Sequence, residues 1–102
     1  MTIYDKAAWQ LDGGMEHTKV ISHFDWIFHW LDQHNMLNED GQELLDIGID
    51  SAASLHSGLL EEEGVSFFDL YYDAIIRDGK YNIVIEQELI EKYYREFTLG
   101  QK

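Results

Sequence analysis

Asp25, His29 and Asp32 have the residue types and spacing that come closest to a metal-binding or catalytic arrangement. At positions i, i+4 and i+7 of a helix they share one polar face, and imidazole and carboxylate groups both bind first-row metals. The chain contains no His-Glu-x-x-His motif, however, and a histidine with acidic neighbours is expected by chance among 20 Asp and Glu residues. We therefore expect a solvent-exposed helix face here, with a metal-dependent enzyme as an alternative.

No other set of residues predicts catalysis. The chain has no cysteine, which excludes disulfides, thiolate metal sites and a cysteine nucleophile. No serine lies in a Gly-x-Ser-x-Gly turn, no glycine-rich phosphate loop occurs, and the carboxylates are too numerous for any pair to stand out. We predict that the protein is not an enzyme and uses neither a metal nor a cofactor.

The charge of the chain is strongly negative and unevenly distributed. A formal net charge of −13 repels nucleic-acid phosphate and anionic lipid, which argues against direct binding to nucleic acid or to a membrane. No Lys or Arg occurs between Lys19 and Arg77, so residues 20–76 hold 12 acidic side chains and no basic one. The other residues hold eight acidic and seven basic side chains. This asymmetry predicts either an acidic solvated face or a docking surface for a cationic partner.

Length and composition predict one domain over residues 1–102. The chain is 45 % hydrophobic and has five Phe, six Tyr and three Trp residues, which are enough to build a core. Its N-terminus lacks a basic region followed by an apolar run, and no apolar stretch approaches the ~20 residues that span a bilayer. We therefore expect a cytoplasmic protein.

The hydrophobic pattern predicts a mainly α-helical fold, a compact bundle of about four helices with an extended N-terminal arm. The complete absence of proline favours helices. We expect an arm over residues 3–12, anchored by Tyr4 and Trp9, and an acidic connection over residues 59–64. The predicted helices cover residues 17–36 (with Thr18 as N-cap and a stop at Asn35), 39–58 (beginning after Asn38, with a break near Gly48), 66–77 (capped by Ser66) and 83–97. Residues 81–85 are β-branched enough to form a short strand instead.

The helix over residues 17–36 has apolar residues on two sides. Its main stripe consists of Val20, Ile21, Phe24, Ile27, Phe28 and Leu31, whereas Trp26 and Trp30 lie almost opposite. Such a helix is typically central and buried on both sides. The alternative is a partly exposed aromatic ridge of the kind that dominates binding hot spots and stacks on arginine.

The N-terminal residues carry a family resemblance. Tyr4-Asp5-Lys6-Ala7-x-Trp9 followed by Gly13-Gly14 resembles the opening of a family of small, acidic, uncharacterised bacterial proteins, whose next helix is matched by Ser22-His23-Phe24 and Trp30. Asp78-Gly79 and Tyr93-Tyr94 resemble the family's closing segment. Gln10 stands where the family usually has His, and the family's Pro after the glycine pair is absent. The family has no established activity, but many small acidic proteins of this kind look like immunity proteins, which bind and neutralise a toxin domain. The shared residues Trp9, His23 and Trp30 have the character of fold determinants.

These observations lead to the hypothesis of a non-enzymatic inhibitor, an immunity protein that neutralises a bacterial toxin such as a nuclease. Its acidic surface would cover the basic groove of the toxin, and its affinity would fall steeply with salt. The alternatives are a DNA mimic that blocks a host defence protein, the metal-dependent enzyme above, and a structural or regulatory domain. The predicted contact residues are an aromatic hot spot among Trp26, Phe68 and Tyr72, ringed by Asp46, Asp50, Glu61, Glu62, Glu63, Asp69 and Asp73.

Overall fold

The structure, a computed structural model, describes residues 1–100 and is 71 % helical, as predicted from the sequence. A four-residue strand and a short helix open the chain, and a second strand interrupts the helices midway. In chain order the elements are β1 (Ile3–Lys6), α1 (Ala7–Asp12), α2 (His17–Gln33), α3 (Glu39–Ile47), β2 (Ser54–His56), the 3₁₀ turn η1 (Ser57–Leu59), α4 (Glu62–Gly79) and α5 (Ile83–Gly100).

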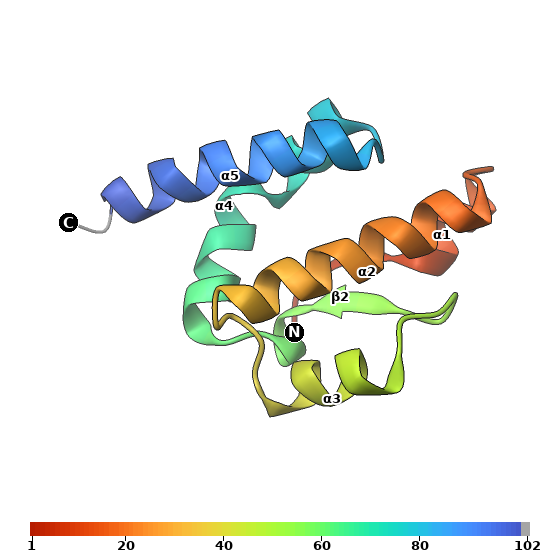
Figure 1. Cartoon of the computed structure of the whole chain (residues 1–102), viewed down its shortest axis with the longest axis horizontal. Helices are drawn as coiled ribbons and strands as arrows, with labels where there is room; N and C mark the ends of the chain where they lie inside the picture. The colour runs from red at the N-terminus through yellow and green to blue at the C-terminus, as the bar shows by residue number, and fades with distance from the viewer. Residues whose placement is uncertain (101–102) are drawn as a thin grey trace.

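The helices and strands lie on two sides of α2. Helices α4 and α5 form an antiparallel pair on one side, and α3 with the β1–β2 sheet lies on the other (Figure 1). The two strands are antiparallel, with Asp5 opposite Leu55 and Lys6 opposite Ser54. This pairing joins the start of the chain to its middle. The sheet and α3 thus cover one side of α2, and the α4–α5 pair covers the other (Figure 1).

Helix α2 has the central position that its two apolar faces predict. Phe24, Ile27, Phe28 and Leu31 are fully buried in the core, and Trp30 is 4 % exposed on the opposite side. The Trp30 indole N–H donates to the Glu91 carboxylate at 2.7 Å, which satisfies the one polar group of the buried ring. The start of the helix differs from the prediction, because Thr18 lies inside it and Glu16 precedes it without a side-chain cap.

The second predicted helix starts at the expected place but ends earlier. Asn38 caps α3 and Glu39 begins it, whereas Gly48 adopts a φ of 112° that stops it after Ile47. The prediction of helix up to Gly58 is wrong, because residues 54–56 pair with β1 instead. That pairing joins residues about fifty positions apart, and the local hydrophobic pattern carries no trace of it.

The N-terminal arm is extended only over β1, and its second half is helix α1, which was not predicted. Tyr4 packs against the core, but Trp9 is 51 % exposed and does not anchor the arm. Lys6 lies over the Trp9 ring, 5.5 Å from its centroid. Trp9, which was expected to anchor the arm, is therefore a surface residue.

The two C-terminal helices are longer than predicted. Helix α4 begins at Glu62 rather than after Ser66, because Glu62 and Glu63 occupy the first turn, where carboxylates favour a helix N-terminus. The alternative of a strand over residues 81–85 is wrong: Tyr81 has a φ of 58°, and the Asn82 side chain accepts the Val84 N–H at 3.1 Å to start α5.

Candidate functional site

An open hollow of about 530 Å³ lies between α3 and the segment around β2. Its lining includes Leu44 and Ile47 of α3, Ala52 and Ala53 before β2, and Leu59 of η1. Ile47 is 76 % exposed, although it is one of the larger aliphatic side chains. The hollow therefore presents apolar surface to solvent at this end of the molecule.

Carboxylates surround this apolar lining. Asp40 and Glu43 lie on α3 and Asp50 lies on the loop that follows it, so acidic side chains border the hollow from two segments. Glu39 and Asp46 add two more exposed carboxylates on α3. None of these five forms an ion pair with a Lys or Arg among residues 1–100. We call this region the α3 groove.

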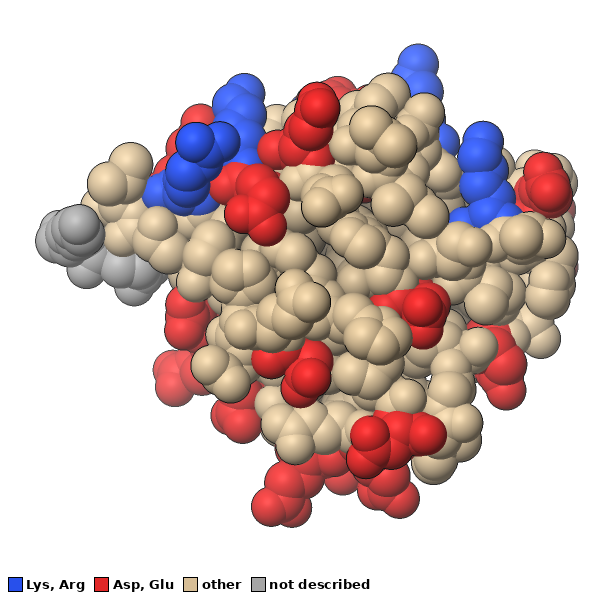
Figure 2. All heavy atoms as spheres, viewed as in Figure 1, with Lys and Arg blue, Asp and Glu red and all other residues tan. Residues whose placement is uncertain are grey.

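The space-filling view shows the same asymmetry across the molecule. Carboxylates gather over the end that α3 occupies, while the visible lysines and arginines lie along the opposite edge (Figure 2). The negative charge of residues 39–50 is therefore exposed at the end of the molecule that α3 occupies.

Helix α3 is held in place by a dense set of local contacts. The Asn38 side chain accepts the Gly41 N–H at 3.0 Å and donates to the Gly58 carbonyl at 2.8 Å. Gly41 lies so close to η1 that a Cβ there would be 2.4 Å from the Leu59 carbonyl oxygen. The α3 groove is therefore preformed, with one wall bound directly to the other.

The predicted acidic residues do not all share this groove. Asp50 lines the hollow, whereas Asp46 lies on α3 but is not one of the lining residues. Glu61 immediately precedes α4, and Glu62 and Glu63 line a separate hollow with Ser66 and Phe97. Asp73 borders a third hollow beside Tyr4, Trp9 and Arg77, and Asp69 accepts the Tyr4 hydroxyl at 2.7 Å. The charge is thus divided into patches, unlike the continuous row of carboxylates expected for a DNA mimic.

Two of the three aromatic candidates need correction. Phe68 and Tyr72 are each 2 % exposed, because they lie on the face of α4 that packs into the core. Neither ring can meet a partner in this structure, so we remove both from the predicted contact residues. Trp26 is half-buried against the core and lies 6.4 Å from His23, ring centroid to ring centroid.

The Asp25, His29 and Asp32 face behaves as an ordinary helix surface. The His29 Nδ1 lies 2.8 Å from the Asp25 carbonyl oxygen and 3.6 Å from its carboxylate, and both side chains are more than half exposed. Within residues 1–100, no three His, Asp or Glu side chains are arranged to hold a metal ion.

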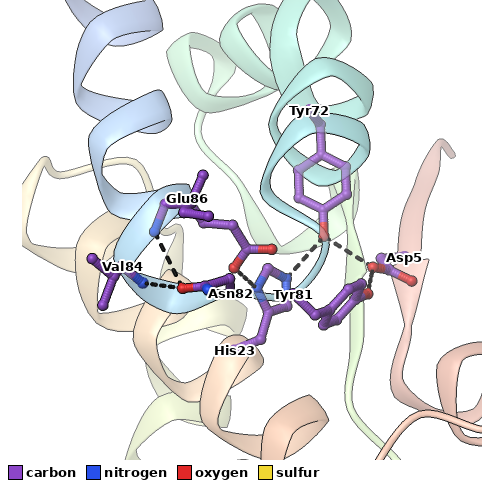
Figure 3. Close-up of polar contacts among 8 residues, drawn as sticks. Asp5, His23, Tyr72, Tyr81, Asn82, Val84 and Glu86 are labelled. Carbon is purple, nitrogen blue, oxygen red and sulfur yellow. Dashed lines mark hydrogen bonds and ion pairs between the residues drawn. The ribbon is translucent and has the colours of Figure 1, made fainter.

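A buried polar network, which the sequence pattern did not predict, lies where β1, α2, α4 and α5 meet. Asp5, His23, Tyr72, Tyr81 and Glu86 come from β1, α2, α4, the α4–α5 turn and α5 (Figure 3). Each is at most 3 % exposed. The network therefore joins four elements and one turn that are distant in sequence.

The Asp5 carboxylate is the main acceptor of the network. Tyr72 donates to its Oδ2 at 3.1 Å, and the Tyr81 hydroxyl donates to the same oxygen. The other oxygen, Oδ1, accepts the Lys6 N–H at 2.8 Å and the Gln10 side chain at 3.0 Å. Four donors thus compensate the loss of water around this carboxylate.

His23 connects the second acid to the tyrosines. Its Nδ1 lies 2.8 Å from Glu86 Oε2, and its Nε2 lies 3.3 Å from the Tyr72 hydroxyl. Because Tyr72 donates its proton to Asp5, it can only accept from His23, so the Nε2 atom carries a hydrogen. Glu86 Oε1 has no partner among residues 1–100.

Burial in this network changes the acidity of its tyrosines. Desolvation raises the pKa of Tyr72 well above its ordinary value of 10.0, and the Asp5 charge raises it further. Desolvation and the hydrogen bond to Asp5 raise the pKa of Tyr81 in the same way. At the surface, partial burial and the Asp69 carboxylate raise the pKa of Tyr4. The network keeps both buried hydroxyls protonated well into the alkaline range.

One sequence signal does point to the network. Glu86 falls within 40° of Ile90 and Phe97 at 100° per residue, so an acidic residue occupies a core position of α5. His23 likewise lies between Ile27 and Trp30 around α2, and both of these residues are apolar. No comparable signal separates Asp5 from the many exposed acids.

Comparison of this chain with protein-family models, curated proteins and solved structures found no significant match. Across residues 1–100, every helix is too short or too polar to cross a bilayer.

Proposed function

We propose that this protein is a non-enzymatic inhibitor, an immunity protein that binds and neutralises a basic bacterial toxin domain in the cytoplasm. The observation that carries the proposal is the α3 groove, where uncompensated carboxylates surround exposed apolar surface. Complementary charge accelerates the encounter with a cationic protein, and contact of the apolar surfaces then lengthens the life of the complex.

A nuclease is the toxin class that fits this surface best. Nucleases must attract phosphate, so their substrate grooves are basic, and an anionic protein competes for the same electrostatic field. A protein that covers such a groove excludes nucleic acid without doing chemistry itself. The acid–base groups of the buried network support this non-enzymatic role, because the His23 and Glu86 side chains are fully buried and out of reach of a substrate.

The proposal predicts that co-expression will rescue cells from the toxin. The test uses the product of the reading frame beside this gene, induced in bacteria alone or together with this protein. We expect growth arrest with the neighbour alone and restored growth with both, together with a complex on size-exclusion chromatography that dissociates at high salt. Growth arrest that persists despite equal expression of this protein would contradict the proposal.

A further inference from the structure

We propose that the α3 groove binds an amphipathic basic segment of the partner, in which Lys or Arg residues flank a short row of apolar side chains. This inference rests on the proposed function, because it names the surface and the recognition mode of the same inhibitor. It assigns the contact to α3 and β2, away from the hollows of α4 and α5.

The α3 surface has the pattern of a helix-binding groove. Asp40, Glu43, Leu44 and Ile47 follow one another at i, i+3, i+4 and i+7, so acidic and aliphatic side chains share the face that borders the hollow. An amphipathic helix laid into such a groove buries its apolar side chains on Leu44 and Ile47. Its lysines or arginines then lie within reach of Asp40 and Glu43.

The loop that follows α3 adds an ordered carboxylate to the lining. Asp50 Oδ1 accepts the Ala52 N–H at 2.8 Å, and the Asp50 carbonyl accepts the Ala53 N–H at 3.0 Å. This turn holds the Asp50 carboxylate at the hollow, together with Asp40 and Glu43 of α3. A cationic segment in the groove would thus meet negative charge from two ordered segments, which lowers the cost of ordering on binding.

Charge and shape identify the class of occupant. The carboxylates repel nucleic acid and anionic lipid, so a phosphate-bearing ligand does not fit. The hollow is open rather than enclosed, so it cannot surround a small molecule as most ligand pockets do. The exposed Ile47 side chain is best buried by a partner segment that carries apolar side chains flanked by cationic ones.

The test uses a synthetic amphipathic peptide of leucine and lysine with helical spacing, and a scrambled peptide of the same composition as control. Binding is measured by fluorescence anisotropy at low salt. We expect the patterned peptide to bind about tenfold more tightly than the scrambled one, because only the patterned peptide places its leucines and lysines on matching faces.

Matched variants locate the contact. The triple substitution Asp40→Asn, Glu43→Gln and Asp50→Asn neutralises the rim, while Asp12→Asn, Glu88→Gln and Glu96→Gln remove the same charge from exposed positions on α1 and α5. We expect the rim variant to weaken binding about tenfold and the control by less than about twofold, since distant charges are screened. Ile47→Ser should weaken binding about fivefold, whereas Leu99→Ser, at an exposed aliphatic residue of α5, should have no effect.

Several outcomes would overturn this assignment. They are no binding of the patterned peptide to the parent protein, equal binding of the scrambled peptide, or equal losses in the rim and control triple variants. A rim variant that still rescues cells from the toxin would also reject the groove while leaving the proposed function intact. If the parent protein fails to rescue cells but binds the patterned peptide at the groove, the proposed function fails and the groove assignment stands.

Discussion

Replacement of Asp5 by alanine is expected to destabilise the protein by about 4 kcal/mol, because the Tyr72 and Tyr81 hydroxyls lose their shared acceptor. A buried donor without a partner costs about 1–3 kcal/mol, and two hydroxyls are affected here. The measurement is the free energy of unfolding in urea, followed by tryptophan fluorescence, to which the buried Trp30 contributes. Since native domains are stable by only 5–15 kcal/mol, the loss would consume much of the total.

The matched control is Asp12→Ala, which removes an exposed acid from α1 and is expected to change stability by less than about 0.5 kcal/mol. The Tyr81→Phe substitution should cost about 1–2 kcal/mol, because Asp5 keeps its other donors. The Asp5→Ala and Tyr81→Phe double variant should lose less than the sum of the two single losses, since the residues act on one hydrogen bond. Equal stability of Asp5→Ala and Asp12→Ala would refute the structural role of the network.

The second large effect is alkaline unfolding. The folded state raises the pKa of Tyr72 and Tyr81, so both keep their protons at pH values where the unfolded chain releases them. Their contribution to stability is therefore complete below pH 10 and is lost as the pH rises above it. Each tyrosine accounts for about 1.4 kcal/mol per pH unit, so together they give a slope of roughly 3 kcal/mol per unit above pH 10.

Urea unfolding at a series of alkaline pH values measures this slope, and tyrosinate absorbance shows whether proton release accompanies unfolding. Tyr81→Phe should halve the slope that the two residues contribute, and Tyr72→Phe with Tyr81→Phe should abolish it. The comparison of variants at each pH removes the contribution of lysine titration, which they share. A slope that is the same in the parent protein and the double variant would show that the buried tyrosines ionise without unfolding.

The sequence predicted those parts of the structure that short-range chemistry determines. The apolar stripe of α2 identified its buried face, and Asn38 followed by two acids marked the start of α3. In each case the signal lies within about two helical turns.

The parts that were missed depend on contacts between distant segments. The pairing of Leu55 with Asp5 turned an expected helix into a strand, and neither segment shows this in its own pattern. The buried role of Asp5 was also not predictable, because its acceptor function depends on Tyr72 and Tyr81, more than sixty residues away. A single acidic side chain is indistinguishable by type from the exposed majority.

The candidate site was predicted in its charge but not in its extent. The segment free of lysine and arginine contains the α3 groove, yet Asp40, Glu43 and Ile47 were absent from the predicted contact residues. Phe68 and Tyr72 were chosen as aromatic hot spots because the helical period alone does not show how wide the buried face of α4 is. The predicted apolar contacts were aromatic residues of α2 and α4, whereas the apolar residues exposed in the groove are aliphatic residues of α3.

Hydrogen exchange of this protein, alone and bound to the toxin domain that it neutralises, would test the central claim most directly. We predict slower amide exchange on binding in residues 39–56, which include α3 and β2, with little change in α5 away from this surface. Protection confined to α5, or to α1 around Trp9, would contradict the assignment of the α3 groove as the surface that binds the partner.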